Sequence, residues 1–139
     1  MENQTIFELI HIMEKATNNM IIKWNQMFNE NIGISHVLVL SHLKEHGKSR
    51  PSDIADRLGF APPSITHLSE KLIKQKLAIR LRDEKDKRIL YLDITDEGKK
   101  ILKKAHEEGV TLRKQLFERL TEEERQQLLA IYIKLNEGW

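Results

Sequence analysis

The amino-acid sequence predicts a mainly α-helical domain that carries one small β-hairpin. Over most of the 139 residues, apolar side chains recur at three- and four-residue spacing, as they do on the buried faces of amphipathic helices. Between residues 79 and 94 the pattern changes to an alternation of apolar and polar side chains, which is typical of short strands. Aromatic residues make up only 6% of the chain, and this low share favours helices that pack on helices.

Helix ends can be placed from proline, glycine and capping residues. The expected helices cover, approximately, residues 5–28, 35–47, 51–58, 62–76, 96–120 and 121–137. Ser35 is expected to be the N-cap of the second helix, and Gly47 is expected to end it. Thr121 and Glu124 have the spacing of a capping box, which begins the last helix.

The two short helices form a recognisable pair. Pro51 and the Pro62-Pro63 pair suit first turns, because proline is tolerated there but not in a helix interior. Gly59 ends the first of the two helices and leaves a turn of three or four residues before the second. Such a pair predicts a helix-turn-helix, in which the second helix enters the major groove of DNA.

Two strands follow this pair. Ile79 and Leu81 alternate with arginines, and from Leu90 to Ile94 the chain alternates again. The segment Asp83–Arg88 between them is too charged for a core, so we expect a hairpin tip in water. A hairpin directly after a recognition helix indicates a wing, and the predicted fold class is a winged helix-turn-helix.

Composition excludes several classes of protein. The chain contains no cysteine, which excludes disulfides, thiolate metal sites and cysteine-based redox sensing. It has no apolar run of 18 residues, and residues 1–4 do not resemble a secretory signal, so we expect a cytoplasmic protein with no membrane partner. No nucleophile–base pair, glycine-rich phosphate loop or metal-ligand set indicates an enzyme, so no catalytic residue and no cofactor are expected.

Charge is unevenly distributed along the chain. The net charge of +2 by itself says little about nucleic acids. Eight basic residues, however, lie between Lys71 and Arg88, across the end of the recognition helix and the hairpin. Basic residues concentrated in this way predict a focused positive patch on the folded protein.

Motifs in the middle of the chain are specific enough to indicate a family. Asp86-Lys87-Arg88-Ile89-Leu90-Tyr91-Leu92-Asp93-Ile94-Thr95 fits the pattern D-x-R-x5-L-T with isoleucine in place of leucine, and Gly98 follows three residues later. With residues 51–58 and 64–72 as its two helices, the segment from about Ser35 to Gly98 resembles the MarR family of bacterial regulators. Lys76 and His67 depart from the family, which often has glycine and arginine at these positions.

This resemblance implies binding to double-stranded DNA through the recognition helix and the wing. Ser64 and Thr66 are placed to donate to base edges or phosphates, and Arg88 is placed to enter the minor groove. Asp86 is expected to orient Arg88 or to pin the loop to the other subunit. The residues expected to contact DNA are Pro62, Pro63, Ser64, Thr66, His67, Lys71, Lys85, Asp86, Lys87 and Arg88.

The resemblance also implies an assembly and a mode of regulation. The chain is expected to be one domain, in which residues 5–34 and 96–139 are dimerisation helices and residues 35–95 are the DNA-binding region. A homodimer is expected to repress transcription from a pseudo-palindromic operator and to be released by a small-molecule effector, although activation is also open. The effector pocket does not follow from the sequence; Met20, Trp24, Met27 and Phe28 suit a core, a dimer interface or such a pocket.

Two alternatives stay open at this point. In the first, the basic hairpin is a solvated surface of a protein-interaction module that does not bind DNA. In the second, the chain is a zinc-responsive regulator, because His42 and His46 have i, i+4 spacing and His106 can join them in space. Isolated histidines on amphipathic helices are more often surface residues, so no metal site is expected.

Overall fold

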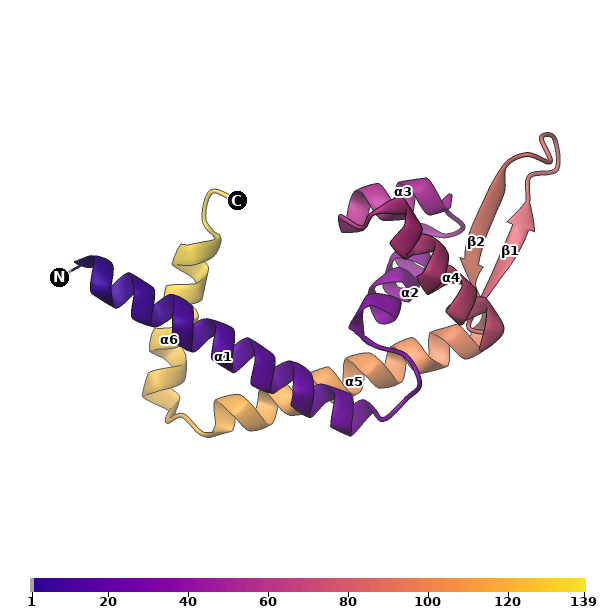
Figure 1. The fold of residues 1–139 in the computed structure, drawn as a ribbon. Coiled ribbons are helices and arrows are strands. Elements are labelled where there is room, and N and C mark those ends of the chain that lie inside the picture. Colours follow the sequence, from indigo (N-terminus) through magenta and orange to yellow (C-terminus); the bar gives the residue numbers. More distant parts are fainter. Residues whose placement is uncertain (1) are drawn as a thin grey trace. The chain divides into compact units, whose positions relative to one another are not determined.

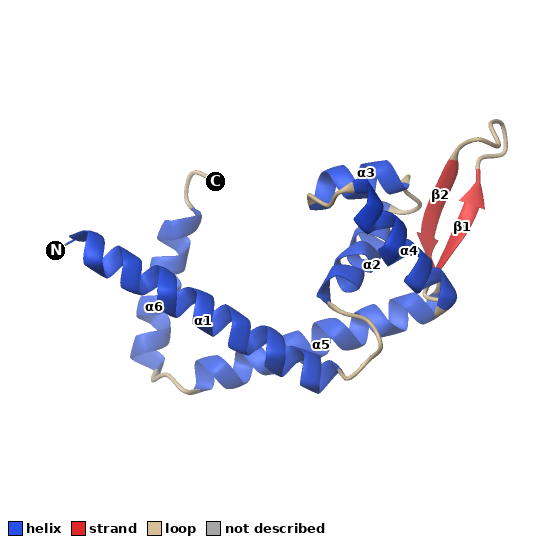
Figure 2. Ribbon diagram, in the orientation of Figure 1, coloured by secondary structure: helices blue, strands red, loops and turns tan. Residues whose placement is uncertain are grey.

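The computed structural model of the chain describes residues 2–139, which are mainly helical. In chain order the elements are α1 (Glu2–Phe28), α2 (Ile34–His46), α3 (Pro51–Leu58), α4 (Pro62–Lys74), β1 (Ala78–Arg82), β2 (Leu90–Ile94), α5 (Asp96–Glu118) and α6 (Glu122–Asn136) (Figure 1). The two strands form one antiparallel pair with a long loop between them (Figure 2). The predicted fold class, mainly α with a small β wing, is confirmed.

The chain divides into two compact units. The central unit, Phe28–His106, holds α2, α3, α4, both strands and the first half of α5. The terminal unit combines α1 up to Met27 with Glu107–Trp139, and so contains the rest of α5 and α6. All ten residues predicted to contact DNA lie in the central unit.

The core of the central unit combines Phe28, at the end of α1, with aliphatic side chains from α2, α3 and α4. Its largest fully buried side chains are Phe28, Val39, Leu40, Leu43, Ile54, Ile65 and Leu72. Burial of one such side chain contributes about 1.5–3 kcal/mol to folding. Leu92 of β2 is also buried, so the sheet shares this core and the wing is anchored to the helices at its base.

The turn between α3 and α4 follows from its local chemistry. Gly59 has a left-handed φ of 73°, and the Phe60 N–H donates to the Ala55 carbonyl at 2.9 Å, which closes α3. Ala61 is extended before Pro62, and the Ser64 N–H donates to the Ala61 carbonyl at 3.0 Å, which opens α4. The predicted bounds of α3 and the predicted start of α4 are therefore confirmed.

The prediction that Ser35 caps α2 is wrong. The helix begins at Ile34, so Ser35 lies inside it, and Gly33 is the N-cap. The Gly33 N–H donates to Nδ1 of His36 at 3.2 Å, so an imidazole takes the place that glutamate has in a capping box. Sequence patterns for helix starts look for serine, threonine, aspartate or asparagine at the cap, and this start has none of them.

The recognition helix is shorter than predicted. It ends at Lys74, two residues before the predicted end, because Lys76 has a left-handed φ of 63°. The Leu77 N–H then donates to the Leu72 carbonyl at 2.9 Å. Glycine adopts a left-handed backbone without steric cost, whereas a lysine there is strained by about 1–2 kcal/mol.

The strand register decides which side chains share a face. Arg80 lies opposite Leu92 and Arg82 lies opposite Leu90, and residues that pair across strands point to the same side. Both arginines are therefore on the face that carries the buried Leu92. Ser49, just ahead of α3, exchanges two backbone hydrogen bonds with Leu92, at 2.9 and 2.8 Å, and so forms an isolated antiparallel bridge to β2.

The wing returns to helix at a tight junction. The Thr95 N–H donates to the Leu77 carbonyl at 3.1 Å, and the Thr95 hydroxyl donates to the Lys76 carbonyl at 2.7 Å. The same hydroxyl accepts from the Gly98 N–H at 3.0 Å and so caps α5. A Cβ atom on Gly98 would lie 2.2 Å from the Leu77 oxygen and 2.7 Å from Cγ1 of Ile94, so only glycine fits without a shift of the backbone.

The terminal unit carries the last helix. Thr121 Oγ1 accepts from the Glu124 N–H at 3.2 Å and Glu124 Oε1 accepts from the Thr121 N–H at 2.9 Å, which confirms the predicted capping box. No residue of α6, all of which the structure describes, is buried. Among the residues that follow Met1, no helix is long and apolar enough to cross a membrane.

The four large side chains near the end of α1 differ in burial. Phe28 is 1% exposed and belongs to the core of the central unit. Met20, Trp24 and Met27 are half-buried in the terminal unit. Of the three roles considered for this group, a place in the core thus applies to Phe28.

Replacing Gly98 by alanine is expected to destabilise the protein by about 3 kcal/mol, because the new methyl group would overlap the Leu77 carbonyl oxygen. Gly109, in the same helix, is the matched control, since its Cβ would meet no atom closer than 3.5 Å. Gly109→Ala is expected to stabilise by about 0.5–1 kcal/mol through helix propensity alone. Urea unfolding measures both, and a loss below about 1 kcal/mol for Gly98→Ala would contradict the tight junction.

Candidate nucleic-acid interface

The first turns of α4 present a polar face to solvent. Ile65, Ser69 and Leu72 are buried, which fixes the side of the helix that faces the core. The predicted contact residues on this helix lie elsewhere around it: Pro62, Pro63, Ser64, Thr66 and His67 are exposed, and Lys71 is half-buried. Burial on one side of α4 therefore leaves its predicted recognition residues accessible on the other.

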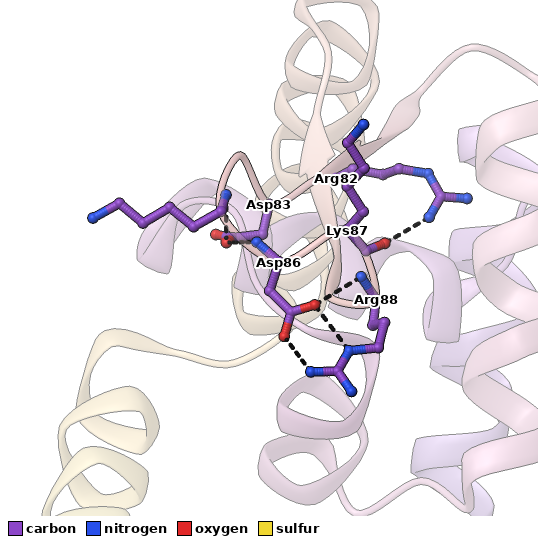
Figure 3. A network of polar contacts seen from close by, with 6 residues as sticks. Arg82, Asp83, Asp86, Lys87 and Arg88 are labelled. Atoms are coloured by element: carbon purple, nitrogen blue, oxygen red, sulfur yellow. Dashed lines mark hydrogen bonds and ion pairs between the residues drawn. The ribbon is translucent and has the colours of Figure 1, made fainter.

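The loop at the tip of the wing is held in shape by its own hydrogen bonds. Oδ2 of Asp83 accepts from the backbone N–H groups of Lys85 and Asp86, at 3.1 and 2.9 Å (Figure 3). This is the way in which an aspartate stabilises a turn through its own side chain. Asp83 and Ile89 also form a backbone bond of 3.0 Å, which closes the loop at its base.

Asp86 and Arg88 form a bidentate pair at the tip. Oδ1 of Asp86 accepts from the Arg88 N–H at 3.0 Å and from Nε at 3.1 Å, and Oδ2 accepts from Nη2 at 3.1 Å (Figure 3). The Arg88 side chain is nevertheless 91% exposed. Two roles were expected for Asp86, to orient Arg88 or to hold the loop against the other subunit. The hydrogen bonds within this chain are those that the first role requires.

Electrostatics keep this pair ionised. The side-chain hydrogen bond from Arg88 is the largest cause that lowers the pKa of Asp86, and the backbone bond from the same residue follows. The charge of Arg50 lowers this pKa further. A lowered pKa means that the pair is intact at neutral pH and is lost only when the pH falls through the pKa of the folded state.

The α4 helix and the wing enclose a groove of 490 Å³. Its lining includes Thr66 and Ser69 from α4, Arg80 and Arg82 from β1, and aliphatic side chains of Pro51, Leu90 and Leu92. The Ser69 hydroxyl is buried and has no hydrogen-bond partner among the residues that the structure describes. A buried hydroxyl without a partner costs free energy.

Of the polar residues that line the groove, Thr66 was among the predicted contact residues, whereas Ser69, Arg80 and Arg82 were not. Arg80 and Arg82 were recognised only as charges of the hairpin, and Ser69 was not singled out. The pairing register in the structure places both arginines on the sheet face that carries Leu92. Alternation within one strand cannot say which of its two faces turns toward the helices.

The histidines do not assemble into a metal site. The rings of His42 and His46 lie 4.6 Å apart, and burial is the main cause that lowers the pKa of His42. Within residues 2–139, no three histidine or carboxylate side chains come together in a way that would hold a metal ion. The zinc-responsive alternative therefore has no geometric support in this part of the chain.

The structure places the ten predicted contact residues in two groups. Six lie on α4, where five are exposed and Lys71 is half-buried, and the other four, Lys85, Asp86, Lys87 and Arg88, lie in the wing loop. Thr66 and Arg82 line one groove, which joins the recognition helix to the base of the wing. Helix face, groove and wing tip all belong to the central unit.

Comparisons with known proteins identify this arrangement. The model of the MarR family matches residues 32–90. The HTH-type transcriptional repressor MdtR of Bacillus subtilis (strain 168) is 34% identical over 113 residues, which cover 78% of this chain and 70% of that protein. The crystal structure of the YusO protein from Bacillus subtilis has a TM-score of 0.83 and 24% identity, over 99% of this chain and 98% of that one.

A further solved structure has the same fold. The PcaV transcriptional regulator from Streptomyces coelicolor, in complex with its natural ligand, has a TM-score of 0.70 and 19% identity, over 92% of this chain and 91% of that one. None of these findings favours the protein-interaction or zinc alternative. The family predicted from the wing motif is confirmed by the family model and by the identity with MdtR. The chain therefore belongs to the MarR family of HTH-type transcriptional regulators, which are DNA-binding proteins and not enzymes.

Proposed function

We propose that this regulator is a cytoplasmic homodimer that represses transcription from a pseudo-palindromic operator and is released by a small organic acid. The observation that carries DNA recognition is the exposed Asp86–Arg88 pair on a loop held by its own hydrogen bonds. A guanidinium presented in a fixed direction suits a minor groove, where negative potential is concentrated. The exposed side of α4 then lies in the adjacent major groove.

The two groups of contacts have different tasks in this proposal. Ser64, Thr66 and His67 read base edges or position the helix on phosphates near its positive end. Lys85 and Lys87 contact phosphates beside the minor groove, and Arg88 enters it. Asp86 brings a negative charge near DNA, which is unfavourable. In this proposal Asp86 offsets that cost because its three hydrogen bonds with Arg88 order the arginine before DNA binds.

Exposed apolar side chains of the terminal unit support the homodimer. On α6, Leu129, Ile131, Ile133 and Leu135 are each more than half exposed. On α1, the large apolar side chains at least half exposed are Ile6, Phe7, Leu9, Ile12, Met13 and Ile22. Exposed apolar side chains in this number favour an interaction site, and a second copy of the chain offers the same side chains by symmetry.

The groove between α4 and the wing supports an effector site. Its volume of 490 Å³ suits a small molecule, and its walls combine aliphatic side chains with the two arginines of β1. This chemistry fits a hydrophobic carboxylic acid, whose carboxylate pairs with arginine. PcaV, a protein of the same fold, was solved with its natural ligand. An acid bound here would release DNA only if it favours a shape that binds the operator less well.

The DNA-binding proposal is tested by selecting duplexes from a random pool and measuring fluorescence anisotropy at two salt concentrations. Arg88→Ala is expected to weaken operator binding by about 10- to 100-fold and to reduce the salt slope by about one unit. Arg119→Ala is the matched control, because it removes an equal charge from an exposed position directly after α5, in the terminal unit. It should change affinity less than about twofold. A pool without enrichment, or equal losses for both variants, would favour the protein-interaction alternative instead.

The dimer is tested by sedimentation velocity on Leu129→Glu/Ile133→Glu, which places two charges on one side of α6. The variant is expected to sediment as one chain, whereas the wild type and the polar control Gln127→Glu sediment as two. Operator affinity should fall at least about tenfold, because a single chain reads only one half-site. If the double variant keeps the mass of two chains, α6 is not part of the interface.

The effector site is tested with benzoate as the probe and benzyl alcohol as its uncharged counterpart. Benzoate is expected to shift the amide signals of Ser69 and Arg80 in NMR titrations and to weaken operator binding. Arg80→Gln should weaken benzoate binding about tenfold, because a charge-assisted pair is lost. Equal binding of benzoate and benzyl alcohol, or an unchanged affinity in Arg80→Gln, would rule out an acid site in this groove.

A further inference from the structure

A third contact shapes the wing tip and comes from the sheet. Nη1 of Arg82 donates to the backbone carbonyl oxygen of Lys87 at 2.7 Å (Figure 3). Arg82 is the last residue of β1, whereas Lys87 lies five residues later on the returning limb of the loop. The bond therefore crosses the loop from its fixed base to the limb that carries Arg88.

The bond from Arg82 holds one end of the peptide unit that joins Lys87 to Arg88. The Lys87 carbonyl and the Arg88 N–H belong to the same planar peptide unit. Arg82 binds this unit at its oxygen, at 2.7 Å, and Asp86 binds it at its nitrogen, at 3.0 Å. A planar unit held at both ends is restrained from rotating, which limits the directions in which Arg88 leaves the backbone.

We propose that Arg82 is a positioning residue of the wing, which fixes the Lys87–Arg88 peptide and so presents Arg88 to DNA in one orientation. This inference rests on the proposed function, because it assigns Arg82 a role in the DNA binding of Arg88. The guanidinium suits the task because its planar donor group is rigid, whereas a lysine ammonium holds a carbonyl without directing it. Without the bond, ordering of this peptide must occur when DNA binds and weakens binding accordingly.

Direct contact between Arg82 and DNA is the competing explanation, since the residue is charged and exposed. The two explanations differ in their dependence on salt and on Arg88. Loss of a phosphate contact reduces the salt slope by about one unit, whereas loss of a positioning contact leaves the slope unchanged. A residue that acts through Arg88 also loses its effect once Arg88 is gone, which a double-mutant cycle detects.

The test compares Arg82→Met, Arg88→Ala and the double variant by anisotropy on the selected operator at two salt concentrations. Arg82→Met keeps the aliphatic stem and is expected to weaken binding about tenfold, with an unchanged salt slope. In the Arg88→Ala background the same substitution should cost less than about twofold. Arg82→Lys should recover part of the affinity. Equal losses in both backgrounds, or a slope reduced by about one unit, would overturn the proposal.

A second readout does not require DNA. Backbone ¹⁵N relaxation of the free protein should give a lower order parameter for the Arg88 amide in Arg82→Met than in the wild type. Arg80→Met is the matched control, because Arg80 lies on the same strand and face but contributes no bond to the loop in the part of the chain described. An order parameter unchanged in Arg82→Met would overturn the proposed restraint of the Lys87–Arg88 peptide by Arg82, even if the selected pool yields no operator.

Discussion

The close approach of α5 to the backbone of Leu77 determines where the wing begins and ends. Lys76 and Leu77 follow the recognition helix, and Thr95 and Gly98 follow the wing, so their contacts close the segment that contains both strands. The strained left-handed backbone of Lys76 turns the chain out of α4, and its carbonyl accepts the Thr95 hydroxyl. The hydrogen bonds of the junction offset this strain, and the absence of a side chain on Gly98 allows them to form.

Internal pairing explains how acidic residues serve a surface meant for DNA. Asp83 and Asp86 would repel phosphates if their carboxylates pointed outward. In the loop, both carboxylates instead accept hydrogen bonds from the loop itself, and Asp86 also binds Arg88. The acids determine the shape of the tip and the basic residues determine its outward charge. The small net charge of the chain therefore does not describe this surface.

The sequence predicted the parts of the fold that depend on local signals. Pro51, Gly59 and Pro62 set the helix-turn-helix because their backbone preferences act within a few residues. Gly33 and His36 escaped prediction, since an imidazole that caps a helix is a rare substitute for glutamate.

What sequence reasoning missed at the site depends on contacts between elements. The groove formed by Ser69, Arg80 and Arg82 requires knowledge of which sheet face meets α4. The bond between Arg82 and Lys87 likewise depends on the conformation of a loop that has no regular pattern. Alternation and helical spacing describe one element at a time, so they identify the charged hairpin but not the partners of its arginines.

Burial distinguishes the two units and bears on the assembly. The central unit buries large side chains from each of α2, α3 and α4, whereas α6 buries none of its residues. Because successive helical residues are about 100° apart, Leu129 and Ile133 lie on one side of α6, and Ile131 and Leu135 lie on the opposite side. A helix that is apolar on two sides needs neighbours on two sides. In the proposed dimer, a second copy of the chain supplies such a neighbour for α6. The same association that pairs the DNA-binding units then also removes apolar surface of α6 from water.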